Sequence, residues 1–144
     1  ELSGDQQAKA CAAMGKMPLA IEVITDKGRV GIVHAEVPDD DWSYFTNALI
    51  NERPANFEHI EHYALWSRGI WQMRHYGSSA FKGVANIDKV IVGHTPVNDV
   101  TAFQNVLYID TGAVFGRKLA MLCIQGPNNG KTFHSDSDYR WRRE

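Results

Sequence analysis

Two short apolar segments of this 144-residue chain each end in a histidine. Residues 90–94 read Val-Ile-Val-Gly-His, and residues 30–34 read Val-Gly-Ile-Val-His. Runs of β-branched residues predict buried strands, and strand ends are where a rigid scaffold presents side chains to a ligand. Neutral imidazole is the commonest protein metal ligand, so His34 and His94 are candidates for a metal site. The pattern alone leaves open the commoner alternative of two hydrogen-bonded structural histidines.

Local patterns predict a domain of the α+β class with flanking helices and a mixed or antiparallel sheet. Capping residues, glycines and apolar spacing predict helices at residues 3–15, from about 41 to 50, and 56–76. A turn at residues 26–29 predicts a hairpin of residues 19–25 and 30–34.

Three further strands are expected in the second half of the chain, and their short connections favour an antiparallel meander. They lie at residues 89–93, 106–109 and 118–124. Residues 1–125 therefore read as one domain, and residues 126–144 as a polar tail.

Composition excludes several classes of function. A net charge of −2 gives no general electrostatic reason to bind nucleic acid or anionic lipid. No apolar run approaches membrane-spanning length. Cys11 and Cys123 are the only cysteines, and we expect both to be buried thiols in a cytoplasmic protein.

Five segments in order resemble one enzyme family. Residues 93–96 read Gly-His-Thr-Pro, and residues 107–116 read Leu-Tyr-Ile-Asp-Thr-Gly-Ala-Val-Phe-Gly. Upstream, residues 19–23 read Leu-Ala-Ile-Glu-Val, residues 33–36 Val-His-Ala-Glu, and residues 66–68 Trp-Ser-Arg. Together they resemble the C-terminal half of the metal-dependent serine/threonine protein phosphatases, in the phage lambda and bacterial branch of the calcineurin-like metallophosphoesterases.

This resemblance implies a fold and an activity. The family packs two mixed sheets between layers of helices (α/β/β/α), and this chain would supply the C-terminal half of that sandwich. The implied activity is that of a hydrolase: phosphoserine and phosphothreonine esters of a phosphoprotein or phosphopeptide are cleaved by a water activated by two divalent metal ions. Manganese is the metal most expected, with iron or zinc as alternatives.

The resemblance also assigns roles to three side chains. It makes His34 and His94 the two histidine ligands of one metal ion, and Arg68 the residue that holds the substrate phosphate. Asp110 begins an Asp-Thr-Gly turn that we interpret as scaffold, so no catalytic residue is assigned. His59 and His62 lie three positions apart on an expected helix, and we interpret them as surface residues.

Three motifs of that family are absent from this sequence. Gly-Asp-x-His-Gly, Gly-Asp-x-x-Asp-Arg-Gly and Gly-Asn-His-Glu do not occur, and Gly4-Asp5 is followed by glutamine. We therefore expect a fragment: the C-terminal part of a longer protein, inactive by itself, that pairs with a missing N-terminal half or self-associates. Two alternatives remain open: a nucleotide hydrolase of the diadenosine tetraphosphate type, and a non-catalytic remnant or interaction domain.

Overall fold

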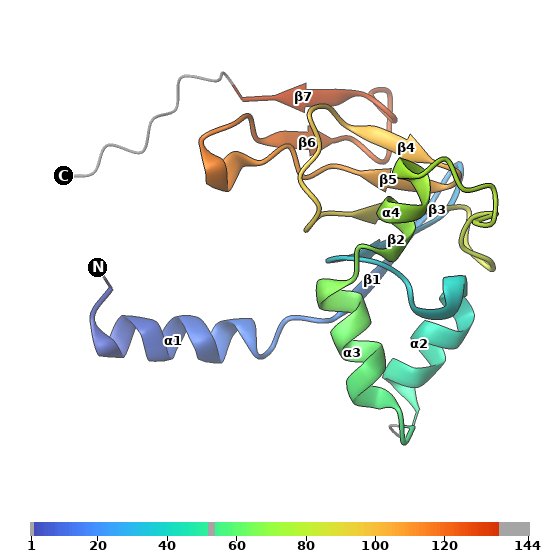
Figure 1. The fold of residues 1–144 in the computed structure, drawn as a ribbon. Coiled ribbons are helices and arrows are strands. Elements are labelled where there is room, and N and C mark those ends of the chain that lie inside the picture. Colours follow the sequence, from blue (N-terminus) through green and yellow to red (C-terminus); the bar gives the residue numbers. More distant parts are fainter. Residues whose placement is uncertain (1, 52–53, 136–144) are drawn as a thin grey trace.

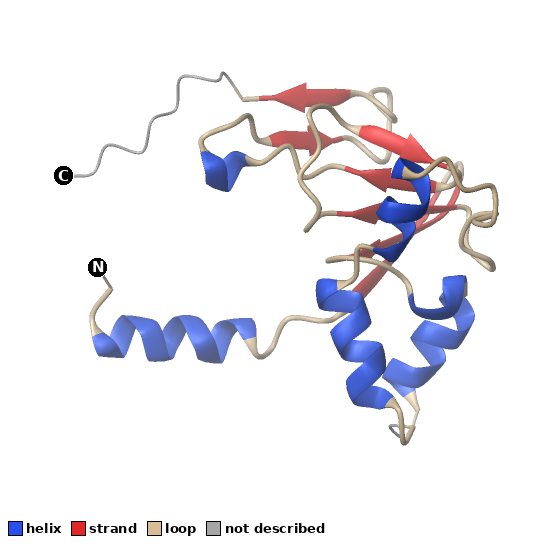
Figure 2. Ribbon diagram, in the orientation of Figure 1, coloured by secondary structure: helices blue, strands red, loops and turns tan. Residues whose placement is uncertain are grey.

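A mixed five-stranded sheet with helices packed against it organises the chain (Figure 1, Figure 2). The computed structural model describes residues 2–51 and 54–135. Its helices and strands, in chain order, are α1 (Gly4–Met14), β1 (Ala20–Thr25), β2 (Gly28–Val33), η1 (Pro38–Asp40), α2 (Trp42–Ile50), α3 (Phe57–Trp66), α4 (Gly69–His75), β3 (Lys89–Val92), β4 (Thr101–Phe103), β5 (Val106–Tyr108), η2 (Ala113–Phe115), β6 (Ala120–Leu122) and β7 (Thr132–His134). The expected α+β class with a mixed sheet is confirmed.

The three central strands of the sheet run parallel. The strand order is β1-β2-β3-β5-β4, with β2, β3 and β5 parallel and the outer strands antiparallel to their neighbours. The meander expected for the second half is therefore wrong. Strand β4 lies between β3 and β5 in sequence and turns the chain back, so that β5 pairs with β3 in the parallel sense. Strands β6 and β7 form a separate two-stranded sheet.

Parallel pairing of β2 with β3 needs a long connection, and residues 34–88 provide it. Helices α2, α3 and α4 all lie in this connection and pack on one face of the sheet. The Asp41 side chain accepts a hydrogen bond from the Tyr44 backbone N–H at 3.0 Å, which begins α2. Pro38 and the turn that precedes α2 are part of the same crossover.

The single helix expected over residues 56–76 is in fact two helices. Helix α3 ends at Trp66, Ser67 has an extended backbone (φ −64°, ψ 146°), and α4 begins at Gly69. The side chain of Glu36 accounts for this break, because it binds Ser67 and the first turn of α4. The apolar periodicity of residues 56–76 continues across the break, so it gives no indication of the Glu36 contact.

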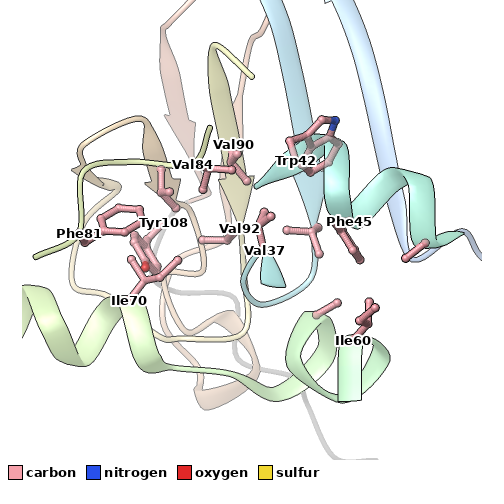
Figure 3. Packing of buried hydrophobic residues seen from close by; sticks show 14 of the residues in the cluster. Val37, Trp42, Phe45, Ile60, Ile70, Phe81, Val84, Val90, Val92 and Tyr108 are labelled. Carbon is pink, nitrogen blue, oxygen red and sulfur yellow. The ribbon is translucent and has the colours of Figure 1, made fainter. Parts of the chain in front are cut away.

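The core lies between the sheet and the three helices (Figure 3). Trp42 and Phe45 from α2 are fully buried, and Gly31 of β2 lies directly beneath the Trp42 ring. Other buried members come from the strands, the helices and the loops between them: Val33, Val37, Ala48, Ile60, Ala64, Ile70, Phe81, Val84, Val90, Val92, Val97, Val106 and Tyr108. Burial of this cluster fixes the register of the helices against β2 and β3.

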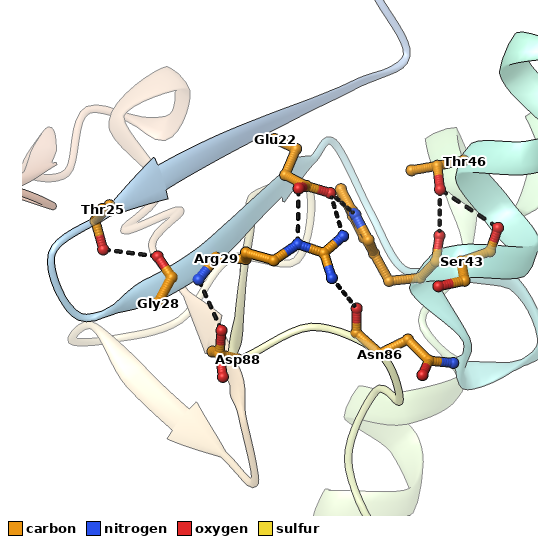
Figure 4. A network of polar contacts seen from close by, with 9 residues as sticks. Glu22, Thr25, Gly28, Arg29, Ser43, Thr46, Asn86 and Asp88 are labelled. Atoms are coloured by element: carbon orange, nitrogen blue, oxygen red, sulfur yellow. Dashed lines mark hydrogen bonds and ion pairs between the residues drawn. The ribbon is translucent and has the colours of Figure 1, made fainter.

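A polar network joins the outer hairpin to α2 (Figure 4). The Glu22 carboxylate accepts hydrogen bonds from Arg29 at 2.8 and 2.9 Å and from the Trp42 indole N–H at 2.7 Å. Arg29 also donates to the carbonyl oxygen of Asn86 at 3.1 Å. These bonds connect β1 and β2 to the loop that leads into β3.

Several peripheral features differ from expectation. No residue of α1 is buried, and the helix extends away from the sheet (Figure 1). Cys11 on this helix is exposed, so its interpretation as a buried thiol is wrong; Cys123 is half-buried. Strand β7 lies within the segment interpreted as a polar tail, and residues 136–144 of that segment lie outside the described residues. In the described part of the chain, no helix is long and apolar enough to cross a membrane.

Candidate functional site

Parallel strands bring His34 and His94 to the same edge of the sheet. Val33 and Val92, the last residues of β2 and β3, are paired in register, and each is followed within two positions by a histidine. The backbone N–H of Gly93 donates to the carbonyl oxygen of His34 at 2.9 Å, which extends the pairing one step past the strands. Because parallel strands share their carboxyl edge, two residues 60 positions apart become neighbours.

The two imidazole rings face each other across this edge. Their centroids lie 5.1 Å apart, and the ring planes are tilted by 58°. His94 has a left-handed backbone conformation (φ +57°), which is uncommon outside glycine. That conformation turns the chain out of β3 immediately after Gly93.

His94 has an unusual environment for a histidine. Its Nε2 atom is buried and has no hydrogen-bond partner among the described residues. The Trp66 ring meets the His94 ring edge-on, with centroids 5.7 Å apart. Burial, together with the positive charge of Arg68 and the nearby His34, lowers the pKa of His94 and therefore favours the neutral imidazole. A neutral ring with an unsatisfied nitrogen is the form that binds metal ions.

Arg68 contacts the turn that carries His94. It is the residue immediately before α4, and its Nη2 donates to the carbonyl oxygen of His94 at 3.4 Å. The side chain is exposed, as a residue that binds an external anion must be. Trp66, two positions earlier, is also 61% exposed.

A buried carboxylate that the sequence analysis missed supports this arrangement. Glu36 is only 1% exposed and accepts hydrogen bonds from the Ser67 hydroxyl at 2.6 Å and from the backbone N–H groups of Ile70 and Trp71 at 3.1 Å each. The Tyr108 hydroxyl lies 3.5 Å from the same carboxylate. Burial and the charge of Glu36 raise the pKa of Tyr108 well above its usual range, so this hydroxyl stays protonated and donates.

The signal for Glu36 was present in the sequence. This residue follows Val33 and Ala35 and precedes Val37, all of them buried in the structure. A carboxylate inside such a run requires internal donors, because a buried charge without partners is costly. The pattern shows that a partner must exist, but only the fold identifies it as the α3–α4 junction.

The Asp110 turn has the geometry expected from its sequence. The Asp110 side chain accepts a hydrogen bond from the Gly112 N–H at 2.8 Å, and Gly112 has a positive φ of 79°. The Thr111 hydroxyl donates to the Lys118 carbonyl oxygen at 2.6 Å. These bonds match the interpretation of this stretch as scaffold.

The residues present fit one part of a metal site. Two converging imidazoles, one with a buried unpartnered nitrogen, are suitable donors for a divalent ion such as manganese, iron or zinc. The described residues contain no group of three or more histidine, cysteine, aspartate or glutamate side chains placed to hold a metal. His59 and His62 are both exposed on α3.

The chain is similar to two bacterial phosphatases. It is 32% identical over 110 residues to serine/threonine-protein phosphatase 2 of Salmonella typhimurium, covering 75% of this chain and 44% of that protein. It is 30% identical over 110 residues to serine/threonine-protein phosphatase 1 of the same organism, covering 76% and 43%. The chain matches no protein-family model.

These similarities support a phosphatase family for this chain. The chain spans less than half the length of the curated relatives it matches. The names of the relatives agree with the phosphatase resemblance of the histidine and arginine motifs, at the level of the family.

Proposed function

We propose that this chain is part of a serine/threonine protein phosphatase that hydrolyses phosphomonoesters of phosphoproteins. One observation carries the proposal: His34, His94 and Arg68 meet at the carboxyl edge of parallel strands, in a chain similar to two phosphatases. That edge is where open α/β sheets commonly bind ligands. A pair of metal-binding imidazoles beside an exposed guanidinium suits a phosphate ester, which carries negative charge at the reacting centre.

His34 and His94 are the proposed ligands of one of two divalent metal ions, with manganese as the expected metal and iron or zinc as alternatives. Such ions, when bound, neutralise phosphoryl oxygens and lower the pKa of a coordinated water. His34 is exposed at the end of β2, whereas the half-buried His94 presents an Nε2 that no described group satisfies. The lowered pKa of His94 favours the neutral imidazole, a form in which one ring nitrogen carries no proton.

Arg68 is the proposed phosphate-binding residue. A planar guanidinium donates two parallel hydrogen bonds to a phosphate, which both binds and orients it. In the structure one of its nitrogens already reaches the His94 carbonyl oxygen, so a phosphate held at the histidines lies within range of the remaining donors. Arg68 therefore orients the substrate relative to the two imidazoles.

The remaining parts of the site are proposed to come from elsewhere in a longer protein. The chain covers 44% of the first relative, and the described residues offer no third metal ligand next to the histidines. We propose that this chain is the C-terminal part of the phosphatase domain, that an N-terminal half completes it in the cytoplasm, and that the isolated chain is inactive.

Two alternatives compete with this proposal. A nucleotide hydrolase of the diadenosine tetraphosphate type would use the same kind of dinuclear site. The names of both relatives favour a protein phosphatase over that alternative. A non-catalytic remnant would retain the fold without the missing ligands.

The test begins with the coding sequence upstream of residue 1. Three metal-binding motifs in frame there would restore the enzyme, whereas a stop codon or an unrelated start would support a remnant. The intact protein is then assayed with manganese on a phosphoserine peptide and on diadenosine tetraphosphate. Preference for the peptide is expected, and preference for the nucleotide would contradict the proposal.

Arg68→Ala in that intact protein tests the phosphate-binding role. The loss of a charged contact to the transferred group should raise the activation free energy by about 2–4 kcal/mol, and kcat/KM should fall accordingly. Arg74→Ala is the matched control, because Arg74 is a second exposed arginine, on α4, that lies over the Trp71 ring. Equal kcat/KM values for the wild type and Arg68→Ala would show that Arg68 does not bind the substrate phosphate.

A further inference from the structure

We propose that Glu36 is a positioning residue that holds Arg68 beside His34 and His94. This proposal rests on the phosphatase function proposed above and gives a role to a residue of the Val-His-Ala-Glu segment to which the resemblance assigns none. Glu36 touches neither substrate nor metal in this account. It acts through the α3–α4 junction, the segment Ser67 to Trp71, in which Arg68 lies.

Glu36 binds this junction on both sides of Arg68. Its Oε2 accepts from the Ser67 hydroxyl at 2.6 Å and from the Ile70 N–H at 3.1 Å, and its Oε1 accepts from the Trp71 N–H at 3.1 Å. The Ser67 oxygen in turn accepts from the Gly69 N–H at 3.2 Å. With bonds before and after it, the Arg68 backbone has little freedom to move.

The same carboxylate connects the junction to the sheet, at the end of β5 and just after His34. Glu36 lies two residues after His34, and the Ala35 N–H donates to the Ala64 carbonyl oxygen on α3 at 2.8 Å. On the opposite side the Tyr108 hydroxyl, at the end of β5, lies 3.5 Å from Oε1. Glu36 therefore links β2, β5 and the α3–α4 junction in one fully buried contact.

A carboxylate suits this position better than any neutral side chain. Four donors converge on it, and an aspartate or glutamate side chain accepts with both oxygens, whereas an amide must direct its NH₂ group toward one of the donors. Burial strengthens each of these bonds and makes a mismatched donor costly. Glu36→Gln thus keeps the shape and changes only the pattern of donors and acceptors.

The consequence for the site is geometric. With the junction held, the Arg68 side chain extends over the turn after β3 and reaches the His94 carbonyl oxygen at 3.4 Å. If the junction were released, α3 could continue as the longer helix that the sequence pattern favours. Arg68 would then move away from the histidines.

The experiment uses the complete 144-residue chain and inorganic phosphate as the probe. Nuclear Overhauser contacts between the Arg68 side chain and His94 are recorded for the wild type, Glu36→Gln and Tyr108→Phe. Tyr108→Phe is the matched control, because it removes one bond to Glu36 without touching the junction. Glu36→Gln should lose these contacts and bind phosphate about tenfold more weakly, equal to about 1.4 kcal/mol. Tyr108→Phe should keep both properties.

A double-variant comparison separates positioning from general destabilisation. If Glu36 acts through Arg68, Glu36→Gln has no further effect on phosphate affinity in an Arg68→Ala background. Retention of the Arg68–His94 contacts and of phosphate affinity in Glu36→Gln would overturn the proposal. An equal loss of affinity in both backgrounds would overturn it as well.

If Glu36→Gln does not fold, Ser67→Ala tests the same link between Glu36 and the α3–α4 junction. Ser67→Ala should then lose the Arg68–His94 contacts, and retention of these contacts would overturn the proposal. If Arg68→Ala binds phosphate as tightly as the wild type, the proposed phosphate-binding role of Arg68 fails. The Overhauser contacts then test the positioning role separately, because their loss in Glu36→Gln supports it and their retention overturns it.

Discussion

Replacing Gly31 with alanine should destabilise the sheet that presents His34. Gly31 lies in the middle of β2, between β1 and β3, with the Trp42 ring over its Cα. An added Cβ would lie 2.6 Å from Trp42 Cη2 and Cζ3 and 2.8 Å from Cζ2. Non-bonded carbons prefer about 3.5–4.0 Å, so the ring must move by about 1 Å.

The Trp42 ring has little room for such a movement. It is fully buried, and its indole N–H is held by Glu22 at 2.7 Å. Overpacking of this kind costs about 1–3 kcal/mol, and three close ring atoms place Gly31→Ala near the upper end. Replacing a strand glycine by alanine recovers about 0.5–1 kcal/mol of backbone entropy. The expected net loss is about 2 kcal/mol, or a fall in Tm of roughly 5–8 °C for a domain of this size.

The assay is urea unfolding followed by far-ultraviolet circular dichroism. Gly93→Ala is the matched control, since a Cβ there meets only the His34 carbonyl oxygen at an ordinary 3.6 Å. That variant should stay within about 0.5 kcal/mol of the wild type. Trp42→Phe removes the three ring atoms that the new Cβ would meet. In that background, Gly31→Ala should therefore lower the free energy of unfolding by less than about half of its effect in the wild type. Equal costs in the two backgrounds, or equal stability of Gly31→Ala and Gly93→Ala, would refute the packing argument.

Two other predictions concern activity and pH. The 144-residue chain alone should not hydrolyse p-nitrophenyl phosphate with added manganese, because two imidazoles provide only part of the ligands that a two-metal site requires. Robust turnover that His94→Ala abolishes would show that the chain builds its own site. Bonds from Arg29 and Trp42 lower the pKa of Glu22 below its usual 4.5. The folded state therefore holds this carboxylate deprotonated to lower pH than the unfolded state, and its stabilisation is present above pH 4.5 and lost as pH falls through the lowered pKa. Acid titration of the unfolding free energy should be shallower for Glu22→Gln than for the wild type, and matching curves would contradict the assigned contacts.

Local patterns in the sequence were enough to predict β2, β3 and the histidines that follow them. A β-branched run that ends in glycine is a short-range signal, and the structure keeps β2 and β3 within two residues of the predicted ranges. The capping residues Ser3 and Asp41 likewise mark the helix starts that the structure contains. Such signals act over a few residues, where propensity and hydrogen bonding are decided locally.

Long-range pairing was not accessible in the same way. Strand β4 spans only three residues, and without it the segments after β3 read as an antiparallel meander. The break between α3 and α4 depends on Glu36, which lies 31 positions before Ser67 in the sequence. A contact between residues so far apart does not change the local apolar pattern, so the sequence predicted one continuous helix across the break.

The place of Arg68 came from the family resemblance, because an isolated arginine in an expected helix carries no signal of function. The structure explains how that arginine comes to lie beside His94: the helix ends before it and restarts after it. Trp66, in the same segment, is 61% exposed although its ring meets that of His94.

His34 and His94 together are proposed to bind one divalent metal ion. The direct measurement is a zinc titration of the 144-residue chain, followed by ¹H–¹⁵N correlation spectra of the imidazole side chains. We expect the His34 and His94 resonances to shift together, those of the exposed His59 and His62 to stay unchanged, and His34→Ala to abolish the response of His94. A response of His94 that persists unchanged in His34→Ala, or zinc binding confined to the α3 histidines, would contradict it.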